Sequence, residues 1–188
     1  EPHYSGELLE LHHSKHHAAY VKGINATMND LREVRSSGDY STINMYQKNM
    51  AFHLSGHVLH SIFWRNLSPD GGGDPTGRLA DELNSAFGSL DGFREHMSRA
   101  ALSIQGSGWA ALSWEPVGSQ LTVEQVFDHQ GNIGNGTIPL LVLDMWEHAF
   151  YLQYRTDKQK WVNNYWELVD WQDVSDRLDS VSRLELNL

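Results

Sequence analysis

Two long segments with helical periodicity, joined by a short polar turn, constrain the fold of this chain more than any other feature. Residues 7–35 carry apolar side chains at three- and four-residue steps, and residues 41–65 form a second segment of the same kind. A Ser-Ser-Gly-Asp turn at residues 36–39 separates them. Two long helices with so short a connection fold back on each other. We therefore expect an antiparallel helical hairpin.

Histidine is concentrated on this hairpin. The chain of 188 residues holds 11 histidines, and seven of them fall in two clusters, one on each expected helix. His12, His16 and Tyr20 follow one another at four-residue steps, so they share one face of the first helix. His60 belongs to a stripe on the second helix that has the spacing of a buried face. In an antiparallel hairpin the His12 face can meet the His60 face.

A linker rich in glycine and proline, residues 68–77, divides the chain. We expect one domain over residues 1–72 and a second over residues 76–188. Beyond the linker, the expected helices are 77–88, 89–104, 146–154, 158–169 and 171–182, and the expected strands are 106–114, 121–128 and 138–143. The fold class is therefore α+β, with a long N-terminal α-helical hairpin and a C-terminal α/β lobe that contains a three-stranded antiparallel sheet.

The stretch Asp-Met-Trp-Glu-His at residues 144–148 places a carboxylate and an imidazole four positions apart. Such a pair is a common way to offer a metal ion two ligands from one segment. We expect Asp144 at the end of a buried strand and His148 at the start of the next helix. With His12 and His60 they make three imidazoles and one carboxylate, a set that can hold iron, manganese or zinc. Taken alone, either hairpin histidine fits a hydrogen-bonded core residue equally well.

Composition excludes several classes of function. The chain has no cysteine, which excludes disulfides, iron–sulfur clusters and cysteine-bound zinc. Its formal net charge of −10 argues against nucleic acid or an anionic membrane as a partner. We find no apolar run long enough to span a bilayer and no signal peptide, so we expect a cytoplasmic protein, or one exported without a conventional signal. The chain begins in mid-pattern without methionine, and we expect a further N-terminal segment.

Four motifs then produce a family resemblance. The stretches at residues 11–20 (LHHSKHHAAY), 56–64 (GHVLHSIFW), 106–109 (GSGW) and 144–149 (DMWEHA) are similar to motifs of the iron/manganese superoxide dismutases, in the same order. The resemblance covers nearly the whole chain. The N-terminal Leu-Pro-x-Leu-Pro-Tyr pattern usual in that family is not present, and this difference removes no metal ligand.

The resemblance implies one metal ion per subunit with His12, His60, Asp144 and His148 as its ligands, in agreement with the spacing. The implied ion is iron, with manganese as the alternative.

Further roles follow only from the resemblance. It implies that His16 and Tyr20 control access of the substrate, and that Trp64, Trp109 and Trp146 form an aromatic wall around the ion. A dry wall of this kind influences the redox potential of a metal.

The resemblance also implies an assembly. Glu147 matches a glutamate that reaches across a twofold interface to the ligand histidine, here His148, of the second subunit. Tyr151 matches a tyrosine that joins His16 across the same interface. We therefore expect a homodimer, and a homotetramer as a further association.

His129 is implied as the residue that contacts metal-bound solvent. Many family members use a glutamine, which in some of them stands four residues before the second ligand; that place is Gly56 here. A histidine with this glycine is typical of actinobacterial members, most of which use iron. Leu59 and His53 stand where many members have asparagine, and neither is a ligand position.

The function implied is conversion of superoxide anion to dioxygen and hydrogen peroxide by redox cycling of one metal ion. We keep two alternatives. The first is a non-redox zinc enzyme or an iron oxygenase with the same ligands, against which the donor set counts. The second is a metal-binding family member with a non-catalytic or surface adhesion role.

Overall fold

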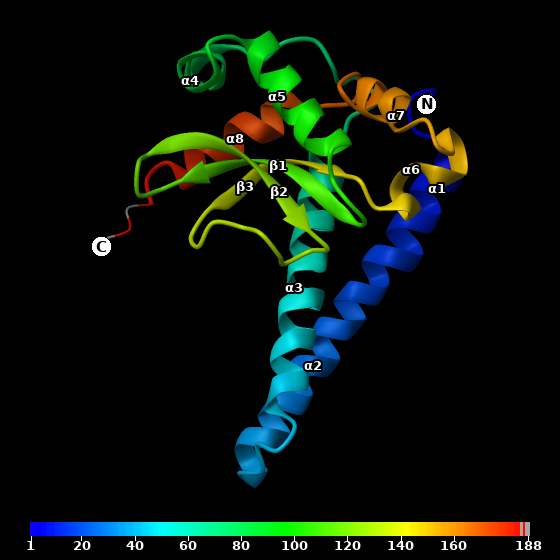
Figure 1. Cartoon of the computed structure of the whole chain (residues 1–188), viewed down its shortest axis with the longest axis vertical. Coiled ribbons are helices and arrows are strands. Elements are labelled where there is room, and N and C mark those ends of the chain that lie inside the picture. Colours follow the sequence, from blue (N-terminus) through cyan, green and yellow to red (C-terminus); the bar gives the residue numbers. More distant parts are fainter. Residues whose placement is uncertain (185, 187–188) are drawn as a thin grey trace.

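The computed structural model describes residues 1–184 and 186, and it confirms the expected hairpin. Helices α2 (Ala18–Ser37) and α3 (Ile43–Arg65) pack against each other and project together from the rest of the molecule (Figure 1). Helix α2 ends at Gly38, whose φ of 73° is a left-handed conformation that glycine adopts without strain. The polar turn predicted between the two segments is therefore where the chain reverses.

The first helix differs from its expected form in one respect. It is divided into α1 (Gly6–Leu11), a π-helical segment η1 (His12–His17) and α2. A π-helix has a wider turn than an α-helix, and single π turns within α-helices occur often at functional sites. This segment carries His16 and the fully buried His12. The expected long helix is therefore present without a break, but its turn at these residues is π-helical.

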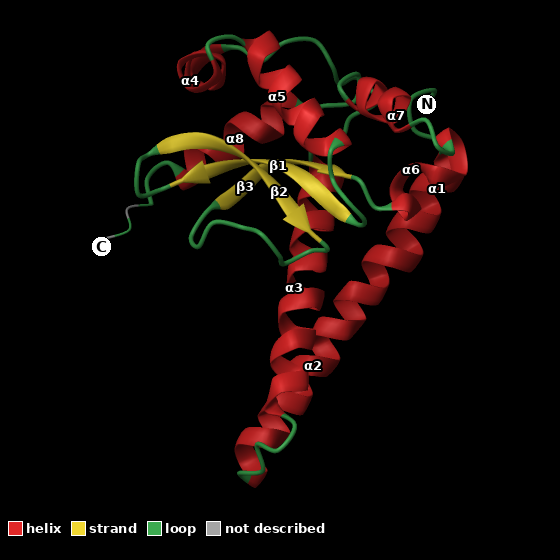
Figure 2. Cartoon of the chain, viewed as in Figure 1, coloured by secondary structure: helices red, strands yellow, loops and turns green. Residues whose placement is uncertain are grey.

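The sheet has three antiparallel strands in the order β2-β1-β3, as expected. Strand β1 (Gly108–Glu115) lies between β2 (Gln120–Phe127) and β3 (Ile138–Asp144), and Figure 2 shows the three strands as one twisted layer. Pro139 lies in the edge strand β3 beside a register shift, where a sheet tolerates a residue without an N–H. The register sets Trp109 of β1 opposite Asp144, the last residue of β3.

Five further helices lie within the described residues: α4 (Gly77–Phe87), α5 (Leu90–Leu102), α6 (Glu147–Tyr154), α7 (Lys158–Tyr165) and α8 (Trp171–Val181). Helix α5 contacts β1 and β2, and α3 and α8 contact β3. Three helices have an N-cap side chain that accepts a hydrogen bond from a backbone N–H of the first turn. These caps are Ser89 at α5, Asp157 at α7 and Asp170 at α8. In the described part of the chain, no helix has the length and apolar character needed to cross a membrane.

The linker is tied to the segment that follows α7. Leu67 and Val169 form an isolated antiparallel bridge, and the Ser68 N–H donates to the Leu168 carbonyl at 2.8 Å. This pairing shortens the helix expected over 158–169, which ends at Tyr165. The domain boundary expected between residues 72 and 76 remains a prediction.

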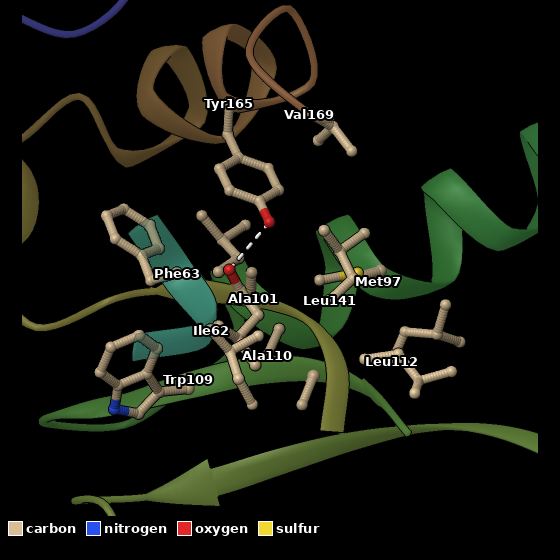
Figure 3. Close-up of a cluster of buried hydrophobic side chains, with 14 of the residues drawn as sticks. Ile62, Phe63, Met97, Ala101, Trp109, Ala110, Leu112, Leu141, Tyr165 and Val169 are labelled. Atoms are coloured by element: carbon tan, nitrogen blue, oxygen red, sulfur yellow. Dashed lines mark hydrogen bonds between the residues drawn. The ribbon is translucent and has the colours of Figure 1, made fainter. Parts of the chain in front are cut away.

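The core lies between the sheet and the surrounding helices, where Figure 3 shows Phe63, Met97, Leu112 and Tyr165 together. All four are fully buried, and burying each such side chain contributes about 1.5–3 kcal/mol. The Tyr165 hydroxyl donates to the Val142 carbonyl at 2.8 Å, so this buried polar atom is paired. This rigid core fixes the ends of α3 and β3, from which two of the candidate ligands extend.

Candidate metal centre

The structure brings the four predicted ligands together from four elements. His12 comes from η1, His60 from α3, Asp144 from the end of β3 and His148 from the first turn of α6, and each offers one donor atom within 4.8 Å of the others. Asp144 Oδ2 lies 3.0 Å from His12 Nε2, 3.4 Å from His148 Nε2 and 3.7 Å from His60 Nε2. Donors bound at about 2.1 Å to one ion lie about 3–4 Å apart, so these four atoms fit around a single ion.

The hydrogen bonds of the imidazoles also fit a metal. His60 Nδ1–H donates to the Gly56 carbonyl at 2.7 Å, so the lone pair of the neutral ring is on Nε2. Within the described residues, Nε2 of His60 and Nε2 of His148 are buried and have no hydrogen-bond partner. A buried polar atom without a partner is costly, and a cation at this point would satisfy both. Three nitrogens and one oxygen without thiolate suit iron or manganese.

Burial sets the charge of these groups. It lowers the pKa of His12, and it lowers the pKa of His60 to about 3. Burial alone raises the pKa of the Asp144 carboxyl, but the adjacent His148 and the hydrogen bond from His12 outweigh it and hold that pKa below its usual value. At neutral pH His12 and His60 are therefore neutral imidazoles and Asp144 is an ionised carboxylate, the forms that bind metals.

His129 lies beside this cluster, in the turn that follows β2. Trp109 Nε1–H donates to His129 Nδ1 at 3.0 Å, and because indole is only a donor, the proton of the neutral ring is on Nε2. The ring stacks on Trp146 at 4.4 Å and lies 5.8 Å from the His60 ring. Burial lowers the pKa of His129 to about 4, so the ring is neutral at pH 7. Its Nε2–H is buried and has no partner in the described chain, and so it is available to a ligand of the metal.

Tyr20 packs against His60 and His129, because Gly56 leaves room for its ring. The Tyr20 ring lies 5.0 Å from the His60 ring and 4.6 Å from the His129 ring. A Cβ atom at Gly56 would lie 2.7 Å from Cδ1 of Tyr20, which is closer than any ordinary contact. A glutamine side chain therefore has no space at residue 56. Burial and the charge of Asp144 raise the pKa of Tyr20, so its hydroxyl keeps its proton.

His16 packs against two of the predicted ligands, His12 and His148. Its ring stacks on His148 at 4.1 Å, with an angle of 18° between the planes. Burial lowers the pKa of His16 to about 4. His16 and His148 line a surface hollow of about 350 Å³ together with exposed residues of α1 and α6, among them Glu147 and Tyr151.

The three predicted wall residues contact the cluster directly. The Trp64 ring lies edge-on to His12 at 4.9 Å, and the Trp109 ring lies edge-on to His60 at 4.9 Å. Trp146 stacks on His148 at 5.4 Å. The side chains of His12, His60 and Asp144 are 0% exposed, so the donors face an interior from which bulk water is excluded.

Tyr4 and Trp161 also contact the predicted ligands, and the sequence did not identify them. The Tyr4 hydroxyl lies 2.7 Å from His12 Nδ1, and Trp161 Nε1–H donates to the Asp144 carbonyl at 2.9 Å. Burial, with the charge of Asp144, raises the pKa of Tyr4 well above its usual value. The only signal in the sequence is the position of Tyr4 directly before the capping Ser5, which says nothing about its partner.

Leu59 and His53, the two noted differences from the family pattern, do not belong to the group of converging donor residues. Leu59 is part of the core. The His53 ring lies against Gly23 of α2, where a Cβ would come within 2.4 Å of it.

Comparisons with known proteins agree with this geometry. The family model for the α-hairpin domain of iron/manganese superoxide dismutases matches residues 1–68, and the model for their C-terminal domain matches residues 75–177. A manganese superoxide dismutase of Mycobacterium intracellulare and an iron superoxide dismutase of Mycobacterium tuberculosis are each 54% identical over 177 residues, which is 94% of this chain and 86% of theirs. A manganese superoxide dismutase of Nocardia asteroides is 53% identical over the same extent. The chain belongs to the iron/manganese superoxide dismutase family.

Proposed function

We propose that this chain converts superoxide to dioxygen and hydrogen peroxide at one ion held by His12, His60, Asp144 and His148. One observation carries the proposal: the donor atoms of these four residues, far apart in the chain, lie within 4.8 Å of one another. Two superoxide anions and two protons yield one dioxygen and one hydrogen peroxide. When bound, iron or manganese supplies the electron transfer, because either ion exchanges one electron between its trivalent and divalent states.

The surrounding residues supply protons and orient the substrate. Tyr20 keeps its phenolic proton because burial raises its pKa, and its ring stands beside the rings of His60 and His129. His129 offers its Nε2–H as a fixed donor to an anion or solvent bound next to the ligands. His16, on the side of the surface hollow, connects the site with bulk water and completes the route for protons. A fixed donor of this kind requires little reorganisation when charge develops.

We propose iron as the native ion and manganese as the alternative. The reason is that the chain has histidine at residue 129 together with glycine at residue 56. The group that donates to metal-bound solvent influences the pKa of that solvent and the redox potential of the metal. The relatives bear names with either metal, so direct measurement decides.

We propose a homodimer in which Glu147 of one copy reaches His148 of the other, and Tyr151 reaches His16. Support comes from the surface around these residues: Glu147 is exposed, and Tyr151 is 42% exposed and lines the same hollow as His16 and His148. Leu11 and other exposed apolar side chains surround the hollow, as is typical of a buried interface. A homotetramer would be a further association of two such dimers. We also propose a cytoplasmic location, because a fold without cysteine needs no oxidising compartment.

The test measures metal and activity on the same sample. Purified protein is analysed for iron, manganese and zinc, and its removal of superoxide is assayed per bound ion. We expect iron or manganese and activity in proportion to it. Protein that holds only zinc, or that is loaded with a redox metal and inactive, would overturn the proposal. A His148→Ala variant that kept both metal and activity would refute the ligand assignment alone. No observation in the described residues or among the relatives favours an adhesion role.

A further inference from the structure

Tyr4 contacts the proposed ligand His12 at the ring nitrogen that faces away from the other donors. Its hydroxyl oxygen lies 2.7 Å from His12 Nδ1, and the two residues are 2% and 0% exposed. The backbone next to Tyr4 is fixed. Ser5 N–H donates to Gln153 Oε1 at 2.8 Å, and Ser5 Oγ accepts from Leu8 N–H at 3.3 Å. These bonds tie the segment to α6, which carries His148, and to the start of α1.

The ring of Tyr4 is held independently of its hydroxyl. It stacks on Trp161 at 5.1 Å, with 27° between the planes, and Phe63 packs edge-on to it at 6.1 Å. Trp161 in turn donates to the Asp144 carbonyl at 2.9 Å. Replacing Tyr4 by phenylalanine therefore keeps these ring contacts and removes only the hydrogen bond to His12.

His12 and His60 are held differently at Nδ1. The partner of His60 is the Gly56 carbonyl, which only accepts, so the His60 proton has a single place on the ring. The partner of His12 is a hydroxyl, which can either donate or accept. This difference matters because His12 Nε2 also lies 3.0 Å from Asp144 Oδ2, an acceptor that favours a proton on Nε2.

Two arrangements of the His12 proton therefore satisfy the same contacts. With no ion bound, Nε2–H donates to Asp144 and the Tyr4 hydroxyl donates to Nδ1. With an ion on Nε2, the ring proton has to be on Nδ1, and Nδ1–H donates to the Tyr4 oxygen. One proton leaves Nε2 and one is taken up at Nδ1, so the charge of the ring does not change. A partner that can both donate and accept keeps the buried His12 Nδ1 hydrogen-bonded in both arrangements, whereas a partner that can only donate or only accept would leave it unpaired in one of them.

We propose that Tyr4 is a positioning residue of the metal centre, and that its hydroxyl reverses its hydrogen bond with His12 when the ion binds. In the metal-bound arrangement the bond orients the ring and increases electron density on Nε2, which strengthens the ligand and favours the trivalent ion. The inference rests on the proposed function only in taking His12 as a ligand.

The experiment compares Tyr4→Phe with Tyr165→Phe. Each variant loses one buried tyrosine hydroxyl, but that of Tyr165 bonds to the Val142 carbonyl in the core and does not touch a ligand. The metal-loaded proteins are transferred into excess chelator, and the rate of ion loss and the midpoint potential are measured. We expect Tyr4→Phe to lose the ion about 10–100-fold faster than wild type and to have a more positive potential. Tyr165→Phe should match wild type in both, whatever its stability.

A second measurement needs no variant. Nitrogen NMR of labelled histidine in the wild-type protein reports which ring nitrogen carries the proton, first without metal and then with zinc as a diamagnetic probe. We expect the His12 proton on Nε2 before zinc and on Nδ1 after it, while His60 carries Nδ1–H in both. A His12 proton that stays on one nitrogen, or a Tyr4→Phe variant that loses its ion at the wild-type rate, would overturn the inference. A wild-type protein that binds no ion would instead overturn the proposed function.

Discussion

The contact between Gly56 and Tyr20 makes a specific prediction for Gly56→Ala. The added Cβ would lie 2.7 Å from Cδ1, 2.8 Å from Cγ and 3.1 Å from Cε1 of the Tyr20 ring. An ordinary contact between carbon atoms is about 3.5–4.0 Å, so the ring has to move by roughly 1 Å. Gly56 is buried in the middle of α3, and Tyr20 is itself only 8% exposed, so little free space is available for this movement.

Two opposing terms determine the stability of the variant. Alanine in place of glycine inside a helix stabilises by about 1 kcal/mol. Overpacking of a buried site costs about 1–3 kcal/mol. The net change is therefore a loss of about 0–2 kcal/mol, which for a chain of this size lowers the Tm by up to about 4–8 °C. The effect on catalysis is expected to be larger, because the phenol that we propose as a proton donor is displaced. A misplacement of about 1 Å costs up to about 100-fold in rate.

The assay is superoxide removal per bound metal ion, with the Tm measured on the same protein. Gly6→Ala is the control, because a Cβ at Gly6, which is also helical, meets only the Glu1 carboxylate at an ordinary 3.6 Å. We expect the control to keep wild-type activity, and Gly56→Ala to lose about tenfold to 100-fold. If Gly56→Ala instead kept full activity and gained about 1 kcal/mol of stability, Tyr20 would not be constrained by residue 56 as described.

Three further predictions concern other parts of the site. Glu147→Ala should shift the dimer towards monomer and speed ion loss, which sedimentation and metal analysis would show; an unchanged dimer would refute the bridge. His129→Phe keeps a ring to stack on Trp146 but removes the N–H beside the ion, and it leaves the Trp109 indole unpaired at a cost of about 1–3 kcal/mol. Its ion should be retained while activity per ion falls about 10–100-fold, and equal activity would remove His129 from the mechanism. The metal-free protein should lose stability as pH falls below 6.5, the ordinary pKa of histidine, because burial lowers the pKa of His60 to about 3 and that of His129 to about 4. Between these values only the unfolded chain takes up the protons, so urea midpoints should decrease from pH 7 towards about pH 4, and constant midpoints would contradict the assignment.

The fold was largely predictable because its strongest signals are local. A helical hairpin requires only two periodic segments and a short turn, and the sheet requires three short apolar or alternating runs separated by turn residues. The expectation that Asp144 ends a strand and that His148 opens a helix is confirmed, because an apolar run and a change of periodicity mark that corner. The π-helical turn at residues 12–17 could not be predicted, since it changes the backbone hydrogen bonds without a distinctive residue composition.

The roles of Tyr4 and Trp161 depend on contacts between distant segments. Tyr4 reaches His12 because Ser5 is bonded to Gln153 and because its ring stacks on Trp161. No spacing rule connects the start of the chain with α6 and α7, so neither residue differs in sequence from an ordinary core aromatic.

The histidine clusters show most clearly what spacing can and cannot identify. His17 and His57 have the same helical spacing as the predicted ligands, yet both ring nitrogens of His17 are paired: Trp64 Nε1–H donates to His17 Nδ1 at 2.8 Å, and His17 Nε2 lies 2.9 Å from His57 Nδ1. Because Trp64 only donates, the His17 proton is on Nε2, and that nitrogen has no lone pair to offer a metal. His60 Nε2, by contrast, is buried with a free lone pair and no partner in the described chain. Periodicity thus identifies the helix face that the histidines share. A candidate ligand differs from a structural histidine in having a ring nitrogen whose lone pair no hydrogen bond uses. Only the fold determines which nitrogens are left in that state.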